Sequence, residues 1–175
     1  MKNPKHSAAL KVTQGAAIAA LYVVLTLVFA PISFGYMQVR IAELLTIMPM
    51  FTPAAIPGLF LGCLLANLMG GAIVWDVVFG SLATLIGAAL GYVLRRNRWL
   101  VPIPTIVANA VIIPPVLRFG YGIVEVPLLL MALYVAVGEI LGCFVLGELW
   151  ATVLLRRGAL LPGKGAPGAR GEGED

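Results

Sequence analysis

The chain has 175 residues, of which 61% are hydrophobic and only 11% are charged, and its mean hydropathy is +1.00. A soluble domain carries about 25% charged and about 45–50% apolar residues. The composition therefore excludes an ordinary soluble domain and predicts an all-α, polytopic membrane protein. The net charge of +4 does not indicate nucleic-acid binding, because the basic residues lie at the ends of apolar runs and not on a surface interleaved with aromatic residues.

The apolar runs predict a bundle of six transmembrane helices, since a spanning helix needs about 20 mainly apolar residues. In chain order, these helices are expected at roughly Val12–Ala30, Val39–Phe51, Ala54–Met69, Val74–Leu94, Leu100–Leu117 and Val126–Leu155. The second is short, and several prolines interrupt the fifth. Residues 1–157 would thus form one transmembrane domain. Residues 158–175 are rich in glycine and proline and end acidic, which predicts a disordered tail.

Basic residues form three clusters along the chain. They are Lys2, Lys5 and Lys11, then Arg95, Arg96 and Arg98, and finally Arg156 and Arg157. An even number of spans places all three clusters on one side of the membrane. Because positive charge marks the cytoplasmic side, both termini are predicted to be cytoplasmic.

An arginine and a glutamate follow the first apolar run. Arg40 and Glu43 are three residues apart, so on a helix they would share a face. An ionisable residue at membrane depth costs at least ~2.5–3.5 kcal/mol unless it is paired or hydrated. Two interpretations are open. The residues could form the lip of a solute site, or they could form a salt bridge that only allows the second helix to insert.

Further polar residues are predicted at the same depth on the other helices. They are Asn67, Asp76, Asn109 and Glu139. Together with Arg40 and Glu43 they give three carboxylates and one guanidinium, a composition that suits a polar ligand with several N–H donors and a positive charge. Any one of them could instead be a structural pair. Glu148, near the inner end of the sixth helix, is assigned to structure or to a partner contact.

Catalytic and metal-binding motifs are missing from the sequence. The only histidine is His6, and there is no HExxH sequence, P-loop or nucleophile–base pair. Cys63 and Cys143 lie inside apolar runs without metal-ligand spacing, so they are interpreted as small packing residues. We therefore expect no enzyme, no cofactor and no metal, and a chain that cannot hydrolyse ATP by itself.

Small residues recur at helical spacing and predict close helix contacts. On the fourth helix they are Gly80, Thr84, Gly87 and Gly91, and on the sixth they are Gly138 and Gly142. Both stripes are expected to pack within the bundle. The first helix has one small face, which includes Ala16 and Ala20, and this face could serve a partner.

Three sequence blocks resemble the QueT family. They are residues 35–49 (GYMQVRIAELLTIMP), 58–68 (GLFLGCLLANL) and 76–85 (DVVFGSLATL), within a resemblance that covers about residues 12–156. The resemblance implies a substrate-binding S component of an energy-coupling-factor (ECF) transporter in the bacterial cytoplasmic membrane. Such a protein takes up queuosine precursors, deazaguanines with an aminomethyl or cyano group. It works with a membrane scaffold subunit, which Ala16 and Ala20 would contact, and with two ATPase subunits.

The resemblance carries a ligand-binding role onto the matching residues Gln38, Arg40, Glu43, Asn67 and Asp76. Asn109 and Glu139 join this set on the depth argument alone, and Tyr36 or Trp75 would offer an aromatic face to a flat ring. Two alternatives stay open. One is an S component for another vitamin-like heterocycle. The other is a stand-alone, proton-coupled secondary transporter, against which the lack of a visible inverted repeat argues.

Overall fold

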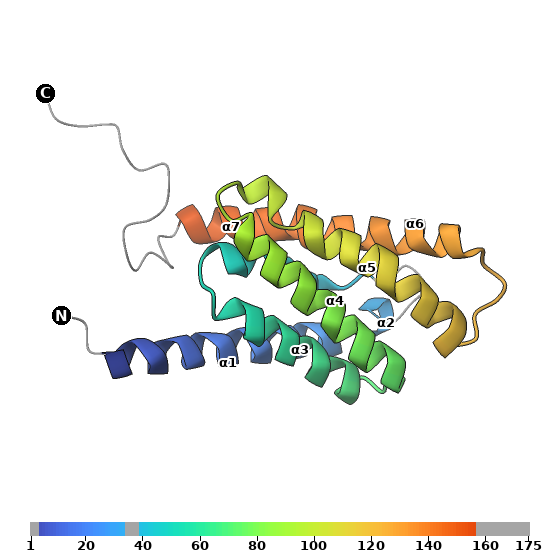
Figure 1. Cartoon of the computed structure of the whole chain (residues 1–175), viewed down its shortest axis with the longest axis horizontal. Coiled ribbons are helices and arrows are strands. Elements are labelled where there is room, and N and C mark those ends of the chain that lie inside the picture. Colours follow the sequence, from blue (N-terminus) through green and yellow to red (C-terminus); the bar gives the residue numbers. More distant parts are fainter. Residues whose placement is uncertain (1–3, 34–38, 157–175) are drawn as a thin grey trace, which may run out of the picture.

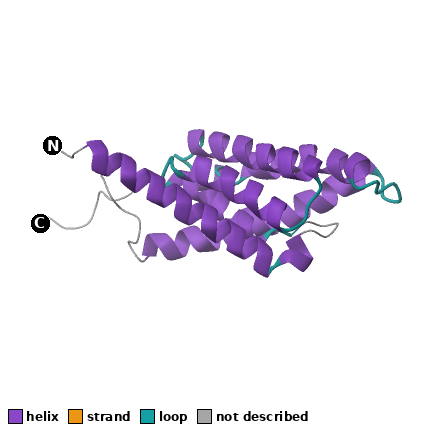
Figure 2. Ribbon diagram, turned by 90° about the horizontal axis from the view of Figure 1, so that it is seen from below, coloured by secondary structure: helices purple, strands orange, loops and turns teal. Residues whose placement is uncertain are grey.

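The computed structural model describes residues 4–33 and 39–156, which form a helical bundle (Figures 1 and 2). These residues contain no strand, which confirms the all-α prediction. They form seven α-helices, some of them short, so the predicted count of six is not confirmed. Four helical stretches are long and apolar enough to cross a membrane: Ala8–Val28, Val74–Val93, Arg98–Gly120 and Leu128–Arg156. Two more apolar helices are shorter, Ile41–Met50 and Ala55–Met69.

The first long helix, α1 (Pro4–Val28), begins before the predicted start and is followed by the short α2 (Ala30–Ser33). The helix after it, η1 (Ile41–Met50), has 3₁₀ geometry where an ordinary α-helix was expected. Runs of 3₁₀ helix longer than three or four residues are uncommon. Seven of the ten residues of η1 are buried, so its packing against neighbouring helices offsets its poorer hydrogen bonds.

Two helices at the centre of the bundle match their predicted bounds within one residue. They are α3 (Ala55–Met69) and α4 (Val74–Val93), joined by a turn in which Gly71 adopts a φ of 75°. A left-handed backbone of this kind favours glycine.

The last two helical stretches are each assembled from several segments. The short η2 (Arg98–Leu100) precedes α5 (Ile103–Pro115), which continues into the π segment η3 (Val116–Gly120). Pro114 and Pro115 have no backbone N–H to donate to the preceding turn, and the π segment starts directly after them. Then α6 (Leu128–Glu139), the π segment η4 (Ile140–Leu146) and α7 (Gly147–Arg156) form one unbroken helical stretch.

The hydrophobic core lies where α1, η1 and α3 meet. It includes Ile18 and Tyr22 of α1, Leu45 of η1, and Leu59 and Cys63 of α3, all buried. Elsewhere many large apolar side chains are exposed on the outer faces of the helices, among them Val74 and Leu129. A soluble monomer rarely exposes so much apolar surface, whereas a lipid bilayer would cover it.

The chain starts and finishes its helices at the same end of the bundle. α1 begins, α7 ends, and the chain turns from α4 into α5 all at this end (Figure 1). The described members of the three basic clusters therefore lie on one side, as the topology argument requires. At this end Arg98 Nε donates a 2.7 Å hydrogen bond to Glu148 Oε2, so the structure gives Glu148 a structural ion pair.

Candidate functional site

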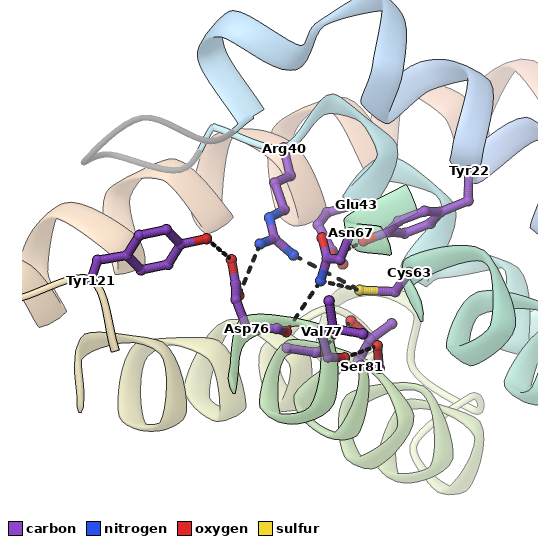
Figure 3. A network of polar contacts seen from close by, with 11 residues as sticks. Tyr22, Arg40, Glu43, Cys63, Asn67, Asp76, Val77, Ser81 and Tyr121 are labelled. Carbon is purple, nitrogen blue, oxygen red and sulfur yellow. Dashed lines mark hydrogen bonds and ion pairs between the residues drawn. The ribbon is translucent and has the colours of Figure 1, made fainter. Parts of the chain in front are cut away.

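Arg40 is buried in the bundle, with only 2% of its surface exposed. Arg40 directly precedes η1 and has an extended backbone (φ −89°, ψ 102°). Its side chain points toward α4. There its Nη2 atom lies 3.5 Å from Asp76 Oδ1 (Figure 3). The ion pair in the structure thus joins Arg40 to Asp76, and not to Glu43 as one interpretation of the sequence had it.

Asp76 lies in the first turn of α4 and collects several partners. The Tyr121 hydroxyl donates a 3.1 Å hydrogen bond to its Oδ2 atom, and Asn67 Nδ2 donates to its backbone oxygen at 3.2 Å (Figure 3). Cys63 Sγ lies 3.8 Å from Arg40 Nη1 and 3.7 Å from Asn67 Nδ2. The carboxylate of Asp76 is therefore neutralised by a guanidinium and held by a neutral donor.

Glu43 lies in the first turn of η1 and is fully buried. The Tyr22 hydroxyl of α1 donates a 2.5 Å hydrogen bond to Glu43 Oε1 (Figure 3). Its other oxygen, Oε2, lies 4.0 Å from Cys143 Sγ of η4. Glu43 and Arg40 are close in sequence, but their strongest contacts are made with different helices.

Glu139 closes the cluster from the last residue of α6. Cys143 Sγ donates a hydrogen bond to Glu139 Oε2 at 3.1 Å. A carboxylate oxygen of Glu43, a carboxylate oxygen of Glu139 and the Cys143 sulfur all lie within 4.8 Å of one another. The approach of η4 to η1 depends on Gly142, since a Cβ atom there would lie 2.7 Å from the Arg40 backbone oxygen. The helix backbone at this point has π geometry, a local irregularity that is frequent at functional sites.

Asn109 of α5 lies beside Glu139 and is 1% exposed. Its amide nitrogen and oxygen are both buried, and neither makes a hydrogen bond of 3.5 Å or less among the described residues, although the amide lies near enough to interact with the Glu139 carboxyl group. Buried polar groups are nearly always satisfied in native proteins. An unsatisfied amide at this position can serve a molecule that brings its own donor and acceptor.

The cluster holds more acidic than basic side chains. Three carboxylates, those of Glu43, Asp76 and Glu139, face the single guanidinium of Arg40, and all four side chains are at most 2% exposed. Unmatched charge at such burial is costly unless it is protonated or paired. The arrangement can accept several N–H groups or a cation.

The structure brings six of the residues singled out from the sequence into this one cluster: Arg40, Glu43, Asn67, Asp76, Asn109 and Glu139. Trp75 is not part of it, because its side chain is 60% exposed and stacks on Phe79 with ring centroids 5.9 Å apart. Trp75 lines an apolar hollow of about 480 Å³ between α4 and the end of α5. Tyr36 and Gln38 fall outside the described residues, as do residues 158–175.

Four residues of the cluster were missed by reasoning from sequence. Tyr22 and Tyr121 were not among the predicted ligand residues, and Cys63 and Cys143 were interpreted as small packing residues. Burial raises the pKa of the Tyr121 phenol above its usual range, and the nearby Asp76 carboxylate raises it further. Tyr121 is therefore a protonated donor at neutral pH. The signal that could have found Tyr22 is a lone hydroxyl in the middle of a span.

The small residues of α1 lie partly inside the bundle and partly on its exposed surface. Ala19 is buried against α3, where a Cβ atom on Gly62 would lie 3.0 Å from the Ala19 Cα atom. Ala16 and Ala20 are exposed on the other side of α1. Ala16 and Ala20, which the sequence suggested as a partner contact, are therefore accessible to a partner protein.

Comparison with known proteins gives a family. The model of the QueT transporter family matches residues 12–156. Over 82 residues the chain is 37% identical to the queuosine precursor transporter QueT of Lactococcus lactis subsp. cremoris (strain MG1363), in a match that covers 45% of this chain and 47% of that protein. The chain thus spans about half the length of this relative. No solved structure matches the chain. Because the family model covers most of the sequence, the chain belongs to the QueT transporter family, a family of transporters and not of enzymes.

Proposed function

We propose that the chain is the substrate-binding membrane subunit of an ECF-type importer. It binds a queuosine precursor, a deazaguanine such as the aminomethyl or cyano compound, and delivers it to the cytoplasm. The observation that carries the proposal is the buried polar cluster in a member of this transporter family. A bundle in lipid has no structural need for three carboxylates and one guanidinium at a single place.

The chemistry of the cluster suits this ligand. The amino-pyrimidinone edge of a deazaguanine carries N–H donors that carboxylates accept in pairs, and its carbonyl oxygen needs a donor such as Asn67 or Asn109. We assign ligand contacts to the six clustered residues, and the neighbouring Tyr121 is the aromatic side chain best placed beside them. Asn109 supports the assignment because neither of its polar atoms makes a hydrogen bond of 3.5 Å or less among the described residues.

Energy for uptake would come from other subunits, because the sequence contains no nucleotide-binding motif. In this proposal a membrane scaffold subunit contacts Ala16 and Ala20 on the exposed face of α1, and two ATPase subunits act on the scaffold. The described residues of the basic clusters share one end of the bundle, and the positive-inside rule assigns that end to the cytoplasm of a bacterial cell membrane.

A second function is favoured by one observation. Two buried carboxylates as close as those of Glu43 and Glu139 could carry a proton, as in a stand-alone secondary transporter. Uptake in cells that lack the ATPase subunits separates the two functions. We expect no uptake there and restored uptake on co-expression. Uptake driven by a proton gradient without those subunits would contradict the ECF proposal.

The ligand itself is tested on the purified protein. The full chain is solubilised in detergent, the co-purified small molecule is identified by mass spectrometry, and the aminomethyl- and cyano-deazaguanines are titrated by calorimetry. We expect a deazaguanine to co-purify and saturable binding of at least one of the two probes. Co-purification of a different heterocycle, with no binding of either probe, would overturn the proposed substrate.

A further inference from the structure

The cluster divides into two parts with different charge balance. In the first part, Asp76 has the Arg40 guanidinium at 3.5 Å and the Tyr121 hydroxyl at 3.1 Å. In the second part, the hydrogen-bond donors to the acids are neutral: Glu43 accepts from the Tyr22 phenol and Glu139 from the Cys143 thiol. Arg40 also attracts Glu43, but one guanidinium balances only one of three carboxylates.

We propose that the pair Glu43 and Glu139, together with Asn109, binds the positively charged ammonium group of the ligand, and that the pair Arg40 and Asp76 does not. The inference rests on the proposed function and deepens it by assigning one part of the site to one chemical group. It predicts that the second part of the cluster sets the preference between a cationic and a neutral ligand.

Donor and acceptor numbers support this assignment. An alkyl ammonium has three N–H donors and no acceptor. Glu43, Glu139 and the Asn109 amide oxygen supply acceptors from three different elements, η1, α6 and α5. Bound there, the ammonium would bring one positive charge to two acids whose closest hydrogen-bond donors, Tyr22 and Cys143, are neutral.

Asn109 is the independent observation that distinguishes this place from a chance cluster of acids. Its side chain is 1% exposed and lies close enough to interact with the Glu139 carboxyl group, yet neither of its polar atoms makes a hydrogen bond of 3.5 Å or less among the described residues. The amide nitrogen of Asn67, by contrast, is engaged with Asp76 and Cys63, and only its amide oxygen has no partner among the described residues. An unsatisfied buried amide marks the position where a bound polar group would be expected.

The test compares two probes that differ in charge. Aminomethyl-deazaguanine carries the ammonium, whereas cyano-deazaguanine is neutral at the same position. Both are titrated by calorimetry into the full-length, detergent-solubilised wild type and the variants Glu139→Gln, Asp76→Asn and Glu125→Gln. Glu125 is an exposed acid in the segment between η3 and α6 and is the matched control.

We expect Glu139→Gln to weaken binding of the aminomethyl probe at least tenfold and to change binding of the cyano probe less than threefold. Asp76→Asn should change both probes by the same factor, and Glu125→Gln should change neither. If Glu139→Gln lowers both affinities equally, or if Asp76→Asn is the variant that removes the preference, the assignment is wrong. Wild-type protein that binds neither probe overturns the proposed function, and the assignment with it.

Two further measurements keep the result interpretable. Thermal unfolding in detergent shows whether Glu139→Gln is folded, and Glu43→Gln replaces it if it is not, with the same expected loss for the aminomethyl probe. Titration with zinc chloride alone checks the competing use of Glu43, Glu139 and Cys143 as metal ligands. If zinc binds through Cys143, so that Cys143→Ala abolishes its binding, it should block the aminomethyl probe; an unchanged affinity of that probe in the presence of bound zinc would overturn the ammonium assignment.

Discussion

Arg40 is the residue on which the charge balance of the bundle interior depends. Removing one member of a buried ion pair leaves the other charge uncompensated, which typically costs about 3–5 kcal/mol, whereas replacing both members by apolar residues is often neutral. Arg40→Met should therefore destabilise the protein by about 3–5 kcal/mol, and the double change Arg40→Met with Asp76→Leu should recover most of that loss. Unfolding in detergent measures both variants.

The matched control is Arg96→Gln, because Arg96 is an exposed base in the turn after α4. A surface charge of this kind contributes at most about 1 kcal/mol, so its removal should leave stability nearly unchanged. A double variant as unstable as Arg40→Met would contradict the role of Arg40 as the counter-ion of Asp76.

At the residue scale, the sequence indicated which polar groups lie deep in the bundle but not how they pair. Arg40 and Glu43 were expected to share a helix face. Arg40 instead lies in extended backbone before a 3₁₀ helix, so the two side chains reach α4 and α1 respectively. Pairing across helices depends on backbone geometry that spacing alone does not reveal. Trp75 and Asp76 illustrate the same limit, since adjacent residues on a helix point in different directions.

At the scale of elements, the small residues of α4 explain its close contact with α5. A Cβ atom on Gly87 would lie 2.6 Å from the Thr105 Cα atom, and one on Gly91 would lie 2.9 Å from the Val101 oxygen. The small residues of α4 therefore pack within the bundle, as the sequence predicted. Small residues allow helix backbones to approach closely in lipid.

Gly87→Ala should consequently destabilise the protein, because overpacking a tight contact costs about 1–3 kcal/mol. Gly147→Ala is the control, since a Cβ atom there would have its nearest contact at 3.4 Å, an ordinary van der Waals distance. Alanine is favoured over glycine inside a helix by roughly 1 kcal/mol, so the control should be neutral or slightly stabilising. Thermal unfolding of both variants compares them, and equal stability would place the α4–α5 contact further apart than in this structure.

Helix positions were easier to predict than helix types. The bounds of α3 and α4 follow from continuous apolar runs, of which the first ends at Gly70 and the second just before Arg95 and Arg96. The 3₁₀ geometry of η1 and the π geometry of η4 arise from packing against neighbouring helices, and Gly142 against the Arg40 backbone is an example. No local sequence signal distinguishes them from ordinary α-helix. The uncertain helix count has the same origin, because η1 and α3 are too short to be recognised as spans by length.

At the scale of the whole molecule, the shared position of the basic clusters predicts the orientation in the membrane. If this end is cytoplasmic, a cysteine introduced at Asn97 should not react with an impermeant maleimide in intact cells, and it should react after permeabilisation. A cysteine at Val124, an exposed residue in the segment between η3 and α6, is the control and should react from outside. Labelling of position 97 in intact cells would reverse the proposed orientation. The variants are made in a background without Cys63 and Cys143.

The exposed and buried sides of α1 are predicted to have different roles, one in partner contact and the other in stability. Ala16 and Ala20 are exposed, whereas Ala19 is buried against Gly62. If the exposed alanines contact a scaffold subunit, Ala16→Leu or Ala20→Leu should abolish uptake in cells that contain all subunits, because close small-residue contacts tolerate little added volume. Ligand binding by the isolated protein should stay within about twofold of wild type, a change of roughly 0.4 kcal/mol. Ala19→Leu should instead lower the thermal stability of the isolated protein. Loss of ligand binding in the Ala16 and Ala20 variants would mean that this face packs inside the protein and not against a partner.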